Sequence, residues 1–199
     1  VFAPIDGVLL THEHYDHVGG LDDLRLFSEI CPVTLYGEER VLQKIRAHMG
    51  YCFGNASQAR VPHFQAQTVE AGKPFVIDGG PERGRVEVMP FHVLHGQLPI
   101  LAYRIGQMAY VTDMKQLPPE SEQYLQNLDF MVVNALRHRP HPTHQTLDDA
   151  IRLVERLDVP QARLIHMDHS VGLHRASDAL LPAHIRMGYD GEVIHLEES

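Results

Sequence analysis

The segment Thr11-His12-Glu13-His14-Tyr15-Asp16-His17 decides the fold, and it follows directly on the apolar run Gly7–Thr11. We expect that run to form a short buried strand, because its apolar residues are continuous and stop at a polar knot. Residues i and i+2 of an extended chain face the same way, so His12 and His14 can reach one cation together. Once the chain turns, Asp16 and His17 point elsewhere and can hold a second cation.

The residue types in this segment point to a transition metal. Imidazole nitrogen combined with carboxylate oxygen suits zinc, manganese or iron. The zincin pattern His-Glu-x-x-His is not met, because Asp16 stands where the second histidine is required. The alternative is a solvated polar loop, but four ligand-type side chains within six positions after a buried strand argue against it.

Composition excludes several classes of protein. The 199 residues are 44% hydrophobic and 22% charged, which is typical of a soluble globular protein, and we expect one domain over residues 1–199. Net charge is −9, so general binding to a nucleic-acid backbone is not expected. No apolar run is long enough to span a membrane. Two cysteines, Cys31 and Cys52, cannot build a disulfide framework, and with no signal-peptide pattern we expect a cytoplasmic protein.

Histidine is unusually frequent, at 15 of 199 residues, and most of the histidines are grouped at the ends of expected strands. The groups are His12/His14/His17, His92/His95, His138/His141/His144 and His166/His169/His174. Ligands brought from several strand ends to one rim are a common way of building a site on a sheet. The grouping therefore supports metal binding.

Strand and helix signals alternate along the chain, and the middle is rich in strands. Expected strands are 7–11, 33–36, 74–77, 85–90, 100–105, 108–111, 130–135, 162–165 and 193–196. Expected helices are 21–30, 38–49 (ended by Gly50), 118–125, 145–157 and 176–187. Residues 51–72 carry no regular pattern, and we expect an insertion or lid there. This order predicts an α/β fold, a sheet-based sandwich with helices outside.

The motifs together resemble the metallo-β-lactamase-fold hydrolases. The string His-x-His-x-Asp-His is the first point of resemblance, and Gln107–Asp113 is similar to the strand of that family that ends in a metal-bridging aspartate. His95-Gly96 resembles the third-ligand histidine, and Arg163–His169 the final ligand motif, with Ile165 where threonine is usual. Asn134–Arg137 followed by Pro142–His144 resembles the branch with the PhnP phosphodiesterase and, more distantly, tRNase Z.

The resemblance implies an αββα sandwich that holds two divalent cations, with zinc or manganese expected and iron as an alternative. We expect the leading strands of this fold to precede Val1. His12, His14 and His95 would hold the first metal, Asp16, His17 and His166 the second, and Asp113 would bridge both together with a hydroxide. Asp16 would also orient that hydroxide. His144 would hydrogen-bond the phosphoryl group or protonate the leaving alkoxide.

Some assignments stay open between neighbouring histidines. His92 competes with His95 for the ligand role, and we favour His95 because Gly96 marks a turn. His169 competes with His166, which directly follows a strand. His169 and His174 are then candidates to lie beside the ligands or the substrate. The remaining histidines, His141 among them, are expected at the surface.

The function implied is a dinuclear metal-dependent phosphodiesterase acting on small cyclic phosphodiesters, of the phosphoribosyl 1,2-cyclic phosphate or 2′,3′-cyclic nucleotide type. Its expected partner is that small-molecule substrate, and we expect it to bind neither a membrane nor nucleic acid. A homodimer is left open. The alternatives are a thioester or lactam hydrolase, a tRNase Z-like endonuclease, a di-iron oxidoreductase, and a module that binds metal without catalysis.

Overall fold

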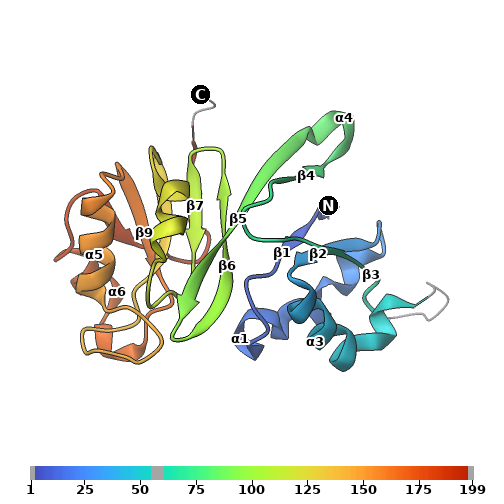
Figure 1. The fold of residues 1–199 in the computed structure, drawn as a ribbon, viewed down its shortest axis with the longest axis horizontal. Helices are drawn as coiled ribbons and strands as arrows, with labels where there is room; N and C mark the ends of the chain where they lie inside the picture. Colours follow the sequence, from blue (N-terminus) through green and yellow to red (C-terminus); the bar gives the residue numbers. More distant parts are fainter. Residues whose placement is uncertain (1–2, 55–60, 197–199) are drawn as a thin grey trace. The chain divides into compact units, whose positions relative to one another are not determined.

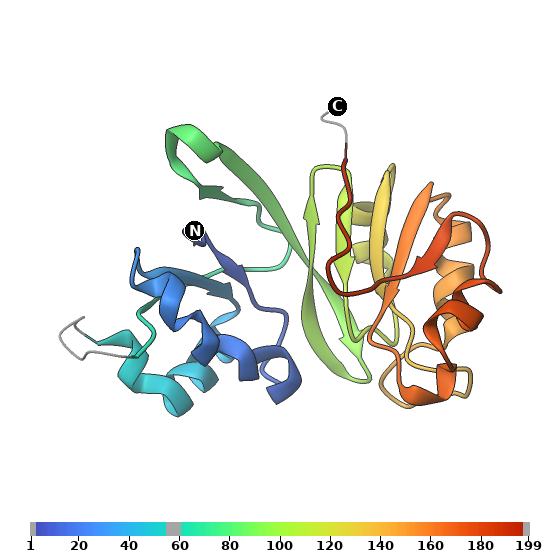
Figure 2. The ribbon, with the colours of Figure 1, turned by 180° about the vertical axis from the view of Figure 1, so that it is seen from behind.

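The computed structural model describes residues 3–54 and 61–196. The chain divides into two compact units, Val1–Pro90 (unit 1) and Phe91–Ser199 (unit 2), and each is described by itself. Figures 1 and 2 show the ribbon from opposite sides, coloured along the sequence.

Unit 1 is built on a three-stranded parallel sheet in the order β1-β2-β3. Its strands are β1 (Val8–Leu9), β2 (Val33–Gly37) and β3 (Phe64–Thr68). The helical segments are α1 (Tyr15–Val18), α2 (Arg25–Ser28), α3 (Glu39–Met49) and the 3₁₀ turns η1 (Gly19–Leu24) and η2 (Gly50–Phe53). A hairpin of β4 (Phe75–Asp78) and β5 (Arg85–His95), with α4 (Gly80–Arg83) at its tip, completes the unit, and β5 continues into unit 2.

The core of unit 1 forms where α3 covers the sheet. Val41, Leu42 and Ile45 lie on one face of α3 and pack with Leu35 of β2. Leu10 is buried in the same core, and its N–H donates to the Tyr36 carbonyl at 2.8 Å. It directly precedes Thr11–His17, the candidate ligand segment (below, the ligand segment), so the start of this segment is tied to the core of the unit.

Unit 2 contains one sheet, in the order β10-β9-β8-β7-β6-β5. Its strands after β5 are β6 (Leu98–Ile105), β7 (Met108–Val111), β8 (Phe130–Asn134), β9 (Gln161–Ile165) and β10 (Ile185–Met187). Strands β7 to β10 run parallel, whereas β6 is antiparallel to β7. The helical segments are η3 (Pro119–Leu125), α5 (Leu147–Arg156), η4 (His169–Val171) and α6 (His174–Asp178).

Helix α5 covers the middle of this sheet (Figure 1). Its buried residues Leu147, Ala150, Leu153 and Val154 join the core formed by β7, β8 and β9. The helix begins with a capping box: the Thr146 hydroxyl accepts from the Asp149 N–H at 3.1 Å, and the Asp149 carboxylate accepts from the Thr146 N–H at 3.0 Å. The predicted helix 145–157 is confirmed, two residues shorter at its start and one residue shorter at its end.

The end of the chain differs from the prediction. The expected helix 176–187 is wrong: α6 ends at Asp178, and Ile185–Met187 form strand β10 against β9. Pro182 lies inside the predicted helix, where its ring and missing N–H oppose helix formation. The expected strand 193–196 is also wrong, since residues 192–196 have no strand assignment, and the Val193 side chain is 73% exposed.

Four further expectations change in detail. The range 51–72 contains the regular strand β3, and its residues 55–60 lie outside the described part of the chain. The range 21–30 forms short turns, η1 and α2, in place of one helix, and 118–125 is a 3₁₀ segment. Gly50 does not end α3 in a left-handed conformation, because its φ is −55° and the chain continues into η2. Among the described residues, no helix has the length and apolar character needed to cross a bilayer.

Candidate metal centre

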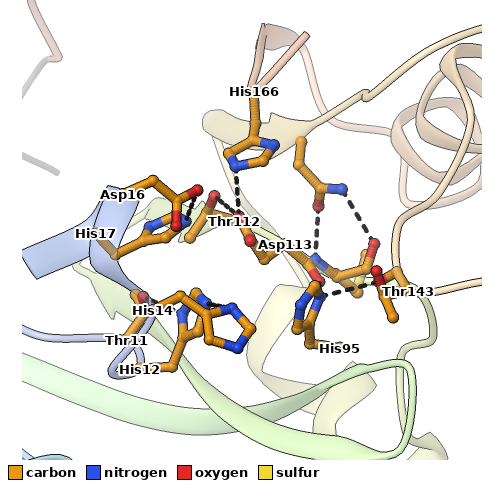
Figure 3. Close-up of polar contacts among 12 residues, drawn as sticks. Thr11, His12, His14, Asp16, His17, His95, Thr112, Asp113, Thr143 and His166 are labelled. Carbon is orange, nitrogen blue, oxygen red and sulfur yellow. Dashed lines mark hydrogen bonds and ion pairs between the residues drawn. The ribbon is translucent and has the colours of Figure 1, made fainter. Parts of the chain in front are cut away.

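In unit 1, the ligand segment brings its histidine rings together. His12 is fully buried, and its Nε2 lies 3.0 Å from Nδ1 of His14 (Figure 3). Its ring also lies 4.4 Å, centre to centre, from the ring of His17. The Thr11 hydroxyl contacts Nδ1 of His12 at 3.0 Å, which fixes the orientation of that ring. Two imidazole nitrogens at this separation can share one cation.

Asp16 and His17 form the second half of this segment. They lie in α1, which begins directly after His14, so the chain has turned as expected. The Asp16 carboxylate lies 3.4 Å from Nε2 of His17, and the Asp16 side chain is 64% exposed. A carboxylate and an imidazole are therefore paired at the start of a helix.

In unit 2, Asp113 and His166 follow the carboxyl ends of the parallel strands β7 and β9. Both have positive φ, 55° for Asp113 and 60° for His166, which is rare for residues other than glycine. Strained backbone of this kind is frequent at functional sites. The His166 Nε2 lies 3.3 Å from Oδ1 of Asp113, which also accepts a 2.6 Å hydrogen bond from the Thr112 hydroxyl (Figure 3).

His95 comes from the end of β5 and also lies against Asp113. Its Nδ1 is 2.9 Å from the Asp113 carbonyl and 3.1 Å from the Thr143 carbonyl. Carbonyl oxygens only accept, so Nδ1 carries the proton and Nε2 keeps its lone pair, which is the tautomer that metal ligands need. Gly96 makes the turn that follows, with φ 64°, and a Cβ there would lie 3.0 Å from the Thr143 side chain.

His144 lies between two of these residues. Its ring centre is 4.6 Å from that of His95 and 5.0 Å from that of His166, and its side chain is 8% exposed. Burial lowers the pKa of His144 to about 4, although the carboxylate of Asp113 opposes the shift. Its Nδ1 is buried and has no hydrogen-bond partner among the described residues. A buried polar atom without a partner is costly, so this nitrogen is available to a water or a ligand.

Three residues of unit 2 support this arrangement and were not assigned a role from the sequence. The Asn134 side chain at the end of β8 donates to the Met114 carbonyl and accepts from the Met114 N–H, and so holds the residue after Asp113. The Gln145 side chain donates to the Asn134 carbonyl at 2.6 Å. His141, expected at the surface, is half-buried, with its ring 5.1 Å from that of His144. The signal for His141 in the sequence was its position three residues before His144.

The other candidate histidines lie elsewhere in unit 2. His92 lines a groove formed with residues of α5. His174 contacts the Met187 carbonyl through Nε2 at 3.2 Å, and its ring packs edge-on against Tyr189. His169 is exposed in η4.

The donors within each unit fit divalent cations. In unit 1, His12 with His14, and Asp16 with His17, offer ligand atoms within 4.8 Å of one another. In unit 2, Asp113 does so with His95 and with His166. Mixed imidazole and carboxylate donors, with Nε2 of His95 unprotonated, match the preferences of zinc, manganese and iron.

Comparison with known proteins identifies the family. A family model described as a beta-lactamase superfamily domain matches residues 1–167. The chain belongs to this superfamily, and the metallo-β-lactamase fold expected from its sequence is confirmed. The crystal structure of a diphosphatase from the PhnP family is similar, with a TM-score of 0.84 and 31% identity, and the match covers 98% of this chain and 72% of that one. This metallo-β-lactamase-type chain therefore lies in the PhnP branch.

Two other relatives are more distant in sequence or in length. The metallo-β-lactamase-fold protein YhfI from Bacillus subtilis has a TM-score of 0.70 at 15% identity, covering 96% of this chain and 78% of that one, and it supports the fold alone. A protein of Porphyromonas gingivalis (strain ATCC BAA-308 / W83) named octanoyltransferase is 40% identical over 188 residues, or 94% of this chain. The present chain spans only 37% of the length of that relative.

Proposed function

We propose that this chain is a dinuclear metal-dependent phosphodiesterase that hydrolyses small cyclic phosphodiesters, such as a phosphoribosyl 1,2-cyclic phosphate or a 2′,3′-cyclic nucleotide. Support comes from its 31% identity to a PhnP-family diphosphatase and from the paired histidine and aspartate donors within each unit. Two divalent cations, when bound, would act as Lewis acids. They would also lower the pKa of a bound water, so that hydroxide is available at neutral pH.

The proposed ligand set follows the family pattern. By that pattern, His12, His14 and His95 would hold one cation, Asp16, His17 and His166 would hold the other, and Asp113 would be shared by both. The proton on Nδ1 of His95 is held by two carbonyl oxygens, which leaves Nε2 to the cation. Asp16 is proposed to accept a hydrogen bond from the attacking water and orient it.

The observation that carries the catalytic assignment is the buried His144. Because the pKa of His144 is lowered to about 4, its imidazole is neutral at pH 7, and a neutral ring has one N–H to donate. We therefore propose that His144 donates a hydrogen bond to a phosphoryl oxygen, in preference to acting as a protonated acid. The buried Nδ1, which has no partner among the described residues, is the atom that we propose donates this hydrogen bond.

The test compares the wild type with His144→Ala and with His138→Ala, an exposed histidine in the same loop, as the control. Each is loaded with zinc or manganese and assayed on bis(p-nitrophenyl) phosphate and on cyclic phosphodiesters. We expect His144→Ala to retain both metals and lose about 10²-fold or more in kcat, as for other positioned hydrogen-bonding groups. Loss of metal in His144→Ala, or an unchanged kcat, would contradict the assignment.

A second candidate function is hydrolysis of acyl thioesters or esters on the same scaffold. The observation that favours it is the 40% identity to a protein named octanoyltransferase, an acyl-transfer enzyme by that name. An acyl thioester assayed beside the phosphodiesters distinguishes the two candidates. Turnover of the thioester with no phosphodiester cleavage would replace the first proposal by the second.

A further inference from the structure

Unit 1 contains a pocket that the proposed chemistry does not use. It has a volume of about 340 Å³, which is near the lower end of the range of about 300–1,000 Å³ for small-molecule sites. We call it the Tyr15 pocket, and its main lining residues are Tyr15, Val18, Leu21, Ile45, Met49 and Tyr51. Tyr15 belongs to the ligand segment itself, between His14 and Asp16.

Apolar side chains form the floor of the pocket, and two tyrosine rings lie at its edge. Val18 and Met49 pack on the core of unit 1, to which Leu21 and Ile45 belong. The rings at the margin are open to solvent, since Tyr15 is 83% and Tyr51 51% exposed. Stacking of a flat ring on such an exposed aromatic side chain is favourable, because it buries apolar surface of both rings. Such a surface favours a planar apolar group.

Gly19 leaves space for the Tyr15 ring beside the pocket. A Cβ at Gly19 would lie 3.0 Å from two ring carbons of Tyr15, closer than ordinary van der Waals contact. The absence of a side chain at residue 19 therefore lets the ring lie along the end of α1. A larger residue at position 19 would displace the ring from this position.

The polar wall of the pocket is rich in acceptors. The Glu13 carboxylate is ion-paired with Arg40. Asp22 is ion-paired with Arg25. Both carboxylates line the pocket, where their remaining lone pairs can accept N–H donors from a ligand.

Two further groups line the same wall. The Nδ1 of His48 lies 2.7 Å from the Lys44 carbonyl, which can only accept, so Nδ1 donates and is not available to a ligand. The Lys44 ammonium adds one donor. A ligand that matches this wall has N–H donors and an acceptor on a planar ring system.

We propose that the Tyr15 pocket binds a nucleobase with an exocyclic amino group, stacked against Tyr15, with its N–H groups directed to Glu13 and Asp22. This inference rests on the proposed function only in assigning the base to the substrate, which would then be a 2′,3′-cyclic nucleotide. The base would lie beside the same segment that carries His12, His14 and Asp16.

The first experiment measures binding without turnover. Adenosine, which has the base and no phosphate, is titrated into the whole chain by calorimetry, for the wild type, Tyr15→Ala and Tyr15→Phe. We expect wild type and Tyr15→Phe to bind adenosine alike, and Tyr15→Ala to bind at least about fivefold more weakly, from the loss of base stacking. No binding to a folded wild type, or equal binding by a folded Tyr15→Ala, would overturn the inference. Circular dichroism checks the fold of each variant.

The second experiment uses kinetics to separate the two proposals. We expect Tyr15→Ala to lose at least about fivefold in kcat/KM on 2′,3′-cyclic AMP, mainly through KM, and to be unchanged on a ribosyl cyclic phosphate that lacks a base. Equal losses on both substrates would overturn the assignment of the pocket to the base. The two proposals can also fail separately. If the metal-loaded protein cleaves no phosphodiester but still binds adenosine in a way that depends on Tyr15, the nucleobase site is supported and the phosphodiesterase activity is rejected.

Discussion

At the scale of single residues, Asp113 is a tightly constrained position of the candidate metal centre. It is 2% exposed, lies at φ 55°, and contacts His166 and Thr112 through one carboxylate oxygen. Asp113→Asn keeps the size and tolerates the positive φ, but it removes the charge. We expect this variant to lose at least one of two metal equivalents by elemental analysis and nearly all turnover. Asp129→Asn, at an exposed site, is the control. Full metal content in Asp113→Asn would contradict its role as a ligand.

His144 makes the stability of the metal-free protein depend on pH. Its folded pKa of about 4 lies below the ordinary 6.5, because burial disfavours the charged ring. Between those values the unfolded chain binds a proton that the folded chain does not, so stability falls as pH falls from about 6.5 to about 4. The loss from this group is on the order of 2–3 kcal/mol.

Urea unfolding of the chelator-treated protein at several pH values measures this effect. We expect His144→Gln to show a smaller decrease in stability between pH 6.5 and 4 than the wild type, whereas His138→Gln follows the wild type. If the two variants have the same pH dependence, His144 does not titrate as described.

At the scale of elements, helix α5 is the clearest case of a structure encoded locally. Thr146 and Asp149 cap each other, and the apolar face is continuous, so its position was predicted closely. We expect Thr146→Ala to lower the free energy of unfolding by about 1 kcal/mol through loss of the cap. Chemical denaturation measures it, with Asp148→Ala, exposed in the first turn, as the control. An effect no larger than that of the control would show that the cap is not stabilising.

Elements that depend on distant contacts were predicted less well. Strand β10 exists because Ile185–Met187 pair with β9 and because the Met187 N–H donates to the Asp178 carboxylate at 2.8 Å. Neither interaction leaves a local pattern in the sequence. The same holds at the candidate site: the donors of residues 12–17 were recognisable from their spacing, whereas the roles of Asn134 and Gln145 depend on hydrogen bonds to Met114 and to each other.

At the scale of the whole molecule, metal binding should appear as added stability. A ligand that binds only the folded state at 100 times its dissociation constant stabilises that state by about 2.7 kcal/mol. We expect zinc or manganese to raise the melting temperature in calorimetry, and a chelator to reverse the increase. Magnesium, which prefers oxygen ligands, should have a smaller effect. No shift with any transition metal would exclude a structured metal centre in this chain.

The spacing of the donors along the chain also bears on how the protein reaches its native state. The four donors of unit 1 occur within residues 12–17, so bringing them together closes almost no loop and costs little chain entropy. Those of unit 2 are spread from His95 to His166 and meet only after strands β7, β8 and β9 have paired. The donor cluster of residues 12–17 can therefore form early in synthesis, whereas the donors of unit 2 come together only when its sheet has formed.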